Sequence, residues 1–163
     1  KAFDQTLNLK QMKKILLFIL FVSTIGLSSY SQTSDLFFSE YLEGSSNNKA
    51  LEIFNGTGAD IDFSSQLYIV RLYANGATTP GNNFTLTGIL KNNSTYVIAN
   101  SSANSTILGL SSVTSTVTFY NGDDAVALFK GNSLIDVIGQ IGFDPGTSWT
   151  SGGLSTAEQT LVR

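Results

Sequence analysis

Short apolar runs separated by turn-forming residues are the feature of this chain that most limits its fold. Beyond Gln32 no stretch keeps the 3.6-residue apolar period of an amphipathic helix, and β-rich runs return about every 8–12 residues instead. Three Asn-Gly pairs, which begin at Asn55, Asn75 and Asn121, favour tight reversals between strands. Strands are expected near Leu36–Leu42, Ala50–Phe54, Leu67–Tyr73, Phe84–Leu86, Thr95–Ala99, Thr116–Phe119, Ala125–Phe129, Leu134–Ile138 and Thr160–Val162.

The connections between these runs predict how the strands pack. Gly131-Asn132-Ser133 separates AVALFK from LIDVIG and predicts an antiparallel hairpin. The Ser/Thr/Asn-rich stretch from Ser101 to Thr116 carries one apolar anchor, Ile107–Leu110, and is expected to cross between sheets. Strands without helices must bury their apolar faces against each other. We therefore expect an all-β chain that forms an immunoglobulin-like, two-sheet antiparallel β-sandwich, with a closed barrel as the alternative.

The N-terminal residues are typical of an export signal. Residues 1–11 carry no pattern and are interpreted as upstream translation or a disordered segment. Residues 12–31 combine a basic start, an apolar run and the small pair Ser29-x-Ser31, which together predict a signal-peptide helix that is cleaved before Gln32. An uncleaved membrane anchor is the alternative. Residues 32–163 are expected to form one domain, and the apolar run that stops at Arg163 predicts a truncated C-terminus.

Charge and composition exclude several classes of function. Of the 9 Lys and Arg residues, 4 precede Gln32, and of the 12 Asp and Glu residues, 1 does, which leaves 5 basic against 11 acidic residues and a charge of −6. A surface of that sign repels phosphate backbones, so direct nucleic-acid binding is not expected. The chain has no Cys and no His. Cys nucleophiles, Ser-His-Asp triads and His-containing zinc sites are therefore excluded, and we expect no catalytic residues and no required cofactor.

Several motifs occur in an order that resembles the secreted, bacterial branch of the lamin-tail domain. They are SEYLEGSSNNKALEIFNGT, FTLTGILKNNSTYVIANSSA, YNGDDAVALFKGNSLIDVIGQIG, DPGTSW and STAEQTLVR, and the resemblance runs from about Leu36 to Arg163. It implies an immunoglobulin-like sandwich without a catalytic motif. It also implies an accessory module of the kind joined to extracellular nucleases, metallophosphatases or other surface hydrolases. The DNA and chromatin contacts of nuclear lamins are not carried over, because this domain is acidic.

The first motif places three glutamates around an Asn-rich turn. Strand alternation puts Glu40 and Leu42 on one face, puts Glu52 outward between two apolar residues, and leaves Glu43 at the end of the first strand. Glycosidase chemistry needs two carboxylates held about 5–10 Å apart across a cleft, and nothing in the sequence fixes such a pair. We interpret the three glutamates as the solvated edge of a hairpin.

Two other groups of residues are candidates for binding. Calcium takes oxygen ligands from carboxylates, amides and carbonyls, and acidic loops of exported β-domains supply them. The alternative for the segment NGDD is a type I′ turn whose aspartates keep the loop wet and bond nearby backbone amides. The calcium candidates are Glu43, Asn47, Asn48, Asp123 and Asp124.

The segment Gly142–Trp149 contains a Pro-Gly turn beside the single tryptophan of the chain. An exposed indole stacks on sugar rings or grips a protein partner, so Asp144 and Trp149 are candidate ligand-binding residues. The alternative is that Trp149 and Phe143 fold over the open end of the sandwich and cap its core.

These observations predict a secreted, non-catalytic module that binds or positions a partner or substrate within a larger extracellular protein. The expected location is outside a bacterium or on its surface, with membrane contact only through the signal peptide before cleavage. Protein and polysaccharide ligands are both candidates. One alternative is the N-terminal accessory domain of a secreted hydrolase, with an extracellular nuclease as the leading case and catalysis beyond Arg163. The other is a carbohydrate-binding module that uses Trp149.

Overall fold

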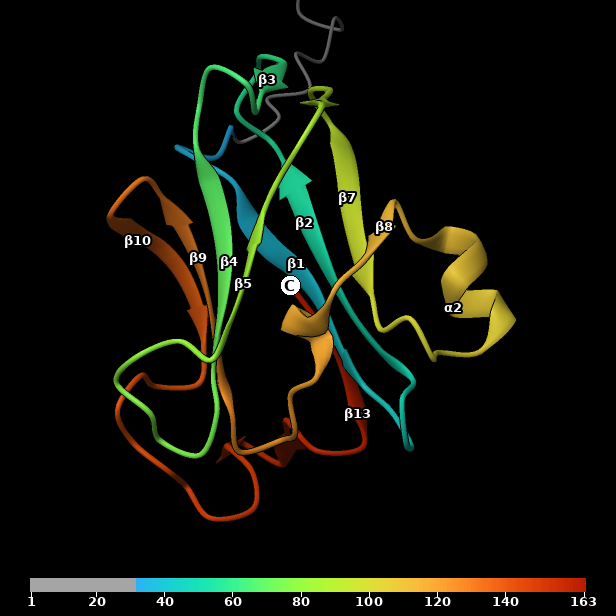
Figure 1. Ribbon diagram of the computed structural model, residues 1–163, viewed down its shortest axis with the longest axis vertical. Helices are drawn as coiled ribbons and strands as arrows, with labels where there is room; N and C mark the ends of the chain where they lie inside the picture. Colours follow the sequence, from blue (N-terminus) through green and yellow to red (C-terminus); the bar gives the residue numbers. More distant parts are fainter. Residues whose placement is uncertain (1–31) are drawn as a thin grey trace, which may run out of the picture. The chain divides into compact units, whose positions relative to one another are not determined.

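A computed structural model describes residues 32–163, which form one compact unit (Figure 1). The expected signal-peptide helix and the segment 1–11 lie outside the described residues. Within residues 32–163, no helix is both long and apolar enough to cross a membrane.

Two β-sheets make up the body of the domain, so the described strands form a sandwich and not a closed barrel (Figure 1). The fold class expected from the sequence is confirmed. Paired strands in both sheets are antiparallel, with the exception of β7 and β8, which pair in parallel. The five-stranded sheet has the order β13 (Gln159–Val162), β1 (Phe37–Glu43), β2 (Lys49–Asn55), β7 (Ser94–Ala99) and β8 (Val113–Thr114). The four-stranded sheet has the order β10 (Ser133–Ile138), β9 (Ala125–Lys130), β4 (Tyr68–Tyr73) and β5 (Asn82–Thr85).

Two short ribbons flank the sheets. Strand β3 (Ile61–Asp62) pairs with β6 (Ile89–Leu90), and β11 (Thr150–Ser151) pairs with β12 (Leu154–Ser155). The predicted hairpin between AVALFK and LIDVIG is confirmed as β9–β10, and it reverses at Gly131, whose φ of 59° is a conformation that glycine adopts without strain.

The core lies between the two sheets because alternate side chains of each strand point inward. In the five-stranded sheet Tyr41 pairs with Leu51 and Leu51 with Ile98, and all three side chains are buried. The four-stranded sheet contributes Val70 and Leu128 to the same apolar cluster. Burial of each such side chain stabilises the fold by roughly 1.5–3 kcal/mol relative to exposure. Because these side chains must face the core, the residues between them in each strand point outward.

The stretch from Ser101 to Thr116 was expected to cross between sheets, but it first returns to its own sheet, because β8 pairs with β7, and the chain reaches the other sheet only through residues 115–124. Two further details of its prediction are wrong. It contains a short helix, α2 (Ser105–Leu110), which begins where the Asn104 side chain accepts a hydrogen bond from the amide of Ile107. No residue of α2 is buried, and Leu110 is 74% exposed. The expected apolar anchor Ile107–Leu110 therefore does not enter the core.

The predicted strand Thr116–Phe119 is also wrong, because residues Thr116–Thr118 form a 3-10 helix, η1. The Ser115 hydroxyl accepts a hydrogen bond from the amide of Val117 and caps this turn. The side chains of Val117 and Tyr120 are completely buried. Since η1 contacts β2 of one sheet and both β4 and β5 of the other, these side chains close one open side of the sandwich.

Candidate functional site

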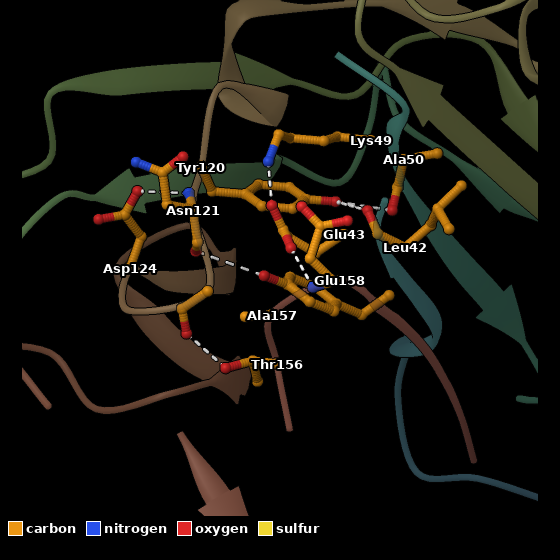
Figure 2. A network of polar contacts seen from close by, with 12 residues as sticks. Leu42, Glu43, Lys49, Ala50, Tyr120, Asn121, Asp124, Thr156, Ala157 and Glu158 are labelled. Carbon is orange, nitrogen blue, oxygen red and sulfur yellow. Dashed lines mark hydrogen bonds and ion pairs between the residues drawn. The ribbon is translucent and has the colours of Figure 1, made fainter. Parts of the chain in front are cut away.

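The end of the sandwich beside the β1–β2 hairpin holds a buried polar network (Figure 2). Glu43 and Lys49 are the last pair of residues in the β1–β2 register. Their side chains point to the same inner face of the sheet as those of Tyr41 and Leu51. The two side chains form an ion pair, with residue exposures of 5% and 7%. The second carboxylate oxygen of Glu43 accepts a hydrogen bond from the amide of Glu158. The interpretation of Glu43 as a solvated hairpin edge is therefore wrong, because Lys49 and this amide compensate its burial.

Two stacked tyrosines form the floor of this network. The rings of Tyr41 and Tyr120 lie 4.8 Å apart between centroids, and the Lys49 ammonium lies 6.0 Å from the centre of the Tyr120 ring. The Tyr120 hydroxyl lies 2.8 Å from the carbonyl oxygen of Ala50 and 2.9 Å from that of Leu42, close enough to donate to either. Burial raises the pKa of both phenols, and the Glu43 carboxylate adds to the rise. These tyrosines are neutral structural groups at physiological pH.

The segment NGDD is folded against the same end of the domain. The Asp124 carboxylate accepts hydrogen bonds from the amides of Asn75 and Asn121, at 2.8 Å each, so the expectation that an aspartate bonds nearby amides is confirmed. The type I′ turn is wrong, because neither Asn121 nor Gly122 has a positive φ. Asp124 is also buried, so it does not keep the loop wet. The hydrogen bonds from these two amides compensate the cost of burying the Asp124 carboxylate.

Three of the calcium candidates lie close enough to act on one phenol, and the other two lie in the β1–β2 turn. The charges of Glu43, Asp123 and Asp124 all act on the Tyr41 phenol and raise its pKa. Asn47 is exposed in the hairpin turn, and the side chain of Asn48 accepts a hydrogen bond from the amide of Asn104. Within residues 32–163 no three carboxylates are close enough together to hold a metal ion. Calcium binding stays a prediction, and an ion here would compete with Lys49 for Glu43.

The candidate ligand-binding residues Asp144 and Trp149 lie in the loop that follows β10. The ring centroids of Trp149 and Phe143 are 5.7 Å apart, and Phe143 is 52% exposed. The indole of Trp149 is half-buried against Gly139, and its nitrogen has no hydrogen-bond partner among the described residues. The Asp144 carboxylate accepts a hydrogen bond from the amide of Gly146. A ligand role for either residue stays a prediction.

Sequence reasoning missed Asp136, which joins the two sheets. It lies on the edge strand β10, and one carboxylate oxygen accepts from the amide of Phe38 on β1 at 2.8 Å and from the Arg163 guanidinium at 2.7 Å. The other oxygen accepts from the amide of Val137. An acidic residue inside the apolar strand run LIDVI is the signal that could have found it. A carboxylate in this place protects the edge of the sheet from pairing with another strand.

The outer face of the five-stranded sheet carries a groove beneath α2. Glu40 and Glu52 are directly opposite each other on β1 and β2, and both line the groove. Its volume is about 250 Å³. The Ser39 hydroxyl donates to Glu52 at 2.7 Å. Figure 1 shows α2 beside β7, on the side of this sheet that faces away from the other one. The remaining groove residues are Leu42, Ala50, Leu51, Thr95, Val97, Ile107 and Leu110.

Two face-to-face sheets, an edge closed by η1 and buried polar contacts at one end define an immunoglobulin-like β-sandwich module. The family model of the lamin tail domain matches residues 29–142. The chain belongs to the lamin tail domain family, which consists of non-catalytic immunoglobulin-like modules. No curated protein and no solved structure is significantly similar to the chain. Strands β11, β12 and β13 lie beyond the matched residues, although β13 completes the five-stranded sheet.

Proposed function

We propose that this chain is an exported, non-catalytic module that binds a partner protein and positions it within a larger extracellular protein. Membership of a non-catalytic family supports the absence of chemistry in this domain. The signal-peptide pattern of residues 12–31 supports export from a bacterium. The surface of the sandwich supplies the candidate binding site for the partner.

The groove beneath α2 is the observation that carries this proposal. The carboxylates of Glu43, Asp124 and Asp136 are occupied by contacts that stabilise the fold. By contrast, the groove leaves Leu110 74% exposed beside apolar side chains of β1 and β7. A hollowed apolar surface on a charged domain is typical of a binding site for another molecule.

Site-specific photo-crosslinking in the organism that makes the chain tests the proposal. A photoreactive phenylalanine analogue replaces Leu110 in the groove or, as a matched control, Ile89, which is 58% exposed on β6 and does not line the groove. We expect a defined adduct in the extracellular fraction for the Leu110 variant and none for the Ile89 variant. No adduct, or equal adducts at both positions, would refute a binding role for this face.

Export is tested separately by mass spectrometry of the extracellular chain. A mature N-terminus at Gln32 is expected if the signal-peptide prediction is right. A chain found only inside the cell would contradict export. The accessory domain of a secreted hydrolase and the carbohydrate-binding module stay predictions of the sequence.

A further inference from the structure

The floor of the groove carries two negative charges without a nearby positive one. Glu40 and Glu52 are cross-strand neighbours, and like charges in that position destabilise a sheet. Within residues 32–163 every basic side chain is engaged elsewhere. Lys49 pairs with Glu43, Lys91 with Asp60, Lys130 with Asp35 and Arg163 with Asp136, while Arg71 lies over the ring of Phe129.

The two carboxylates differ in how they are held. The Ser39 hydroxyl donates to one oxygen of Glu52 and so orients this carboxylate, which keeps its other oxygen for a further donor. The described residues give the Glu40 side chain no hydrogen-bond or ion-pair partner. Opposed carboxylates with spare acceptor capacity are suited to a planar group that donates to both.

The walls and the size of the groove restrict what can enter it. Leu42, Val97, Ile107 and Leu110 provide apolar walls. A volume of about 250 Å³ lies below the roughly 300–1,000 Å³ of pockets that bury a whole drug-sized ligand. The groove therefore fits one long side chain whose carbon stem lies along the apolar walls.

We propose that the groove binds a segment of a partner protein that presents an arginine flanked by apolar residues. The guanidinium would donate to Glu40 and Glu52, and the flanking residues would contact Leu110 and Ile107 of α2. Arginine fits better than lysine because its planar fork bridges two carboxylates, whereas an ammonium is a strongly hydrated point charge. This inference rests on the proposed function and names the chemistry of the partner.

Peptide binding to the purified chain, followed by NMR of its backbone amides, tests the inference. One peptide has the form Leu-Val-Arg-Val-Leu with blocked ends, and the matched peptide carries citrulline, which keeps the shape and removes the charge. We expect the arginine peptide to shift amides of β1, β2, β7 and α2. We expect the citrulline peptide to bind at least about tenfold more weakly, because a charged hydrogen bond contributes that much.

A charge-matched pair of variants isolates the two glutamates. The double variant Glu40→Gln/Glu52→Gln should bind the arginine peptide no more tightly than the citrulline peptide. The control Asp144→Asn/Glu158→Gln removes the same net charge outside the groove and should keep the preference for arginine. The melting temperature of the Glu40→Gln/Glu52→Gln variant should stay the same or rise, because a like-charge repulsion is removed.

The results that would contradict the arginine assignment differ from those that would contradict the proposed function. Equal affinity for the two peptides, shifts confined to other elements, or a lower melting temperature of the Glu40→Gln/Glu52→Gln variant would overturn it. Equal competition by spermidine and by the arginine peptide would assign the groove to small polyamines and overturn the peptide assignment. If the Leu110 crosslink forms in cells but the arginine preference is absent, the proposed function survives and only this inference fails.

Discussion

Glu43 and Lys49 form an ion pair across the β1–β2 hairpin on the inner face of the sandwich, and both side chains are almost completely buried. Removal of a charge from water costs several kcal/mol, so neither residue is tolerated there without the other. The amide of Glu158, just before β13, donates to the same carboxylate. The pair therefore also connects the first hairpin to the last strand of the domain.

Replacement of Lys49 by methionine should destabilise the chain strongly, because it leaves the Glu43 carboxylate buried without its counter-charge. We expect a loss of about 3–5 kcal/mol in the free energy of unfolding. Urea denaturation measures it. The double variant Lys49→Met/Glu43→Leu should recover most of the loss, since both charges are then absent. Lys91→Met, which removes an exposed ion pair with Asp60, is the control and should leave the urea midpoint unchanged. Equal midpoints for Lys49→Met and Lys91→Met would show that the buried pair has no special role.

Asp136→Ala should loosen the contact between the two sheets, because the amide of Phe38 loses its acceptor. We expect a loss of about 1–3 kcal/mol in the free energy of unfolding, which is typical when a buried donor loses its partner. Native-state hydrogen exchange should show faster exchange of the Phe38 amide. Asp144→Ala is the control, because its carboxylate accepts from a single amide, that of Gly146, in an exposed loop. Unchanged exchange at Phe38 in the Asp136→Ala variant would show that the Asp136 carboxylate does not hold this amide of the other sheet.

Alkaline pH should destabilise the domain through its buried phenols. Burial raises the pKa of Tyr41, Tyr68 and Tyr120 above the usual value near 10. Above about pH 10 the unfolded chain loses these protons while the folded chain keeps them, so stability falls as pH rises from there toward the folded pKa values. Denaturation at a series of pH values measures the slope, and ultraviolet absorbance reports tyrosinate.

The Tyr120→Phe variant should show a shallower loss of stability above pH 10, because one of the three phenols with a raised pKa is removed. Ionisation of every tyrosine near pH 10 in the folded chain would contradict the raised pKa values.

Gly139→Ala should displace the indole of Trp149. A Cβ at position 139 would lie 2.6 Å from the indole nitrogen, and the positive φ of 80° adds strain to any side chain. The matched control is Gly153→Ala, where φ is 84° but nothing lies within 4 Å of the new Cβ. Because the chain has a single tryptophan, its fluorescence emission reports this site alone. We expect a red shift in Gly139→Ala only, and a red shift of equal size in Gly153→Ala would assign the effect to backbone strain.

Local patterns predicted most strands because the apolar residues that mark a strand lie within a few positions of each other in the sequence. The run 50–54 shows this, since its inward residues Leu51 and Ile53 are buried, whereas an irregularity between Phe38 and Glu40 shifts the alternation of the run 36–42, and the run 125–129 is buried on both faces. The run Thr116–Phe119 failed because β-branched residues favour strands, while the cap from Ser115 and the burial of Val117 favour a tight turn that crosses between sheets.

The buried acids were harder to predict because their partners are distant in sequence. Alternation from Tyr41 does place Glu43 on the inner face, but it does not reveal that Lys49 begins the next strand opposite it. Asp136 bonds the amide of a residue 98 positions away. No local pattern contains that pairing, because it follows from the way the two sheets pack.

The place of β1 between β2 and β13 has a consequence for the time course of folding. The register joins Glu40 to Val162, so the first strand of the sheet obtains its second neighbour only from the last strand. Contacts over such sequence distances make folding slow, in the range of about milliseconds to seconds for β-sandwiches. A chain delivered from its N-terminus would expose one edge of β1 until residue 162 arrives.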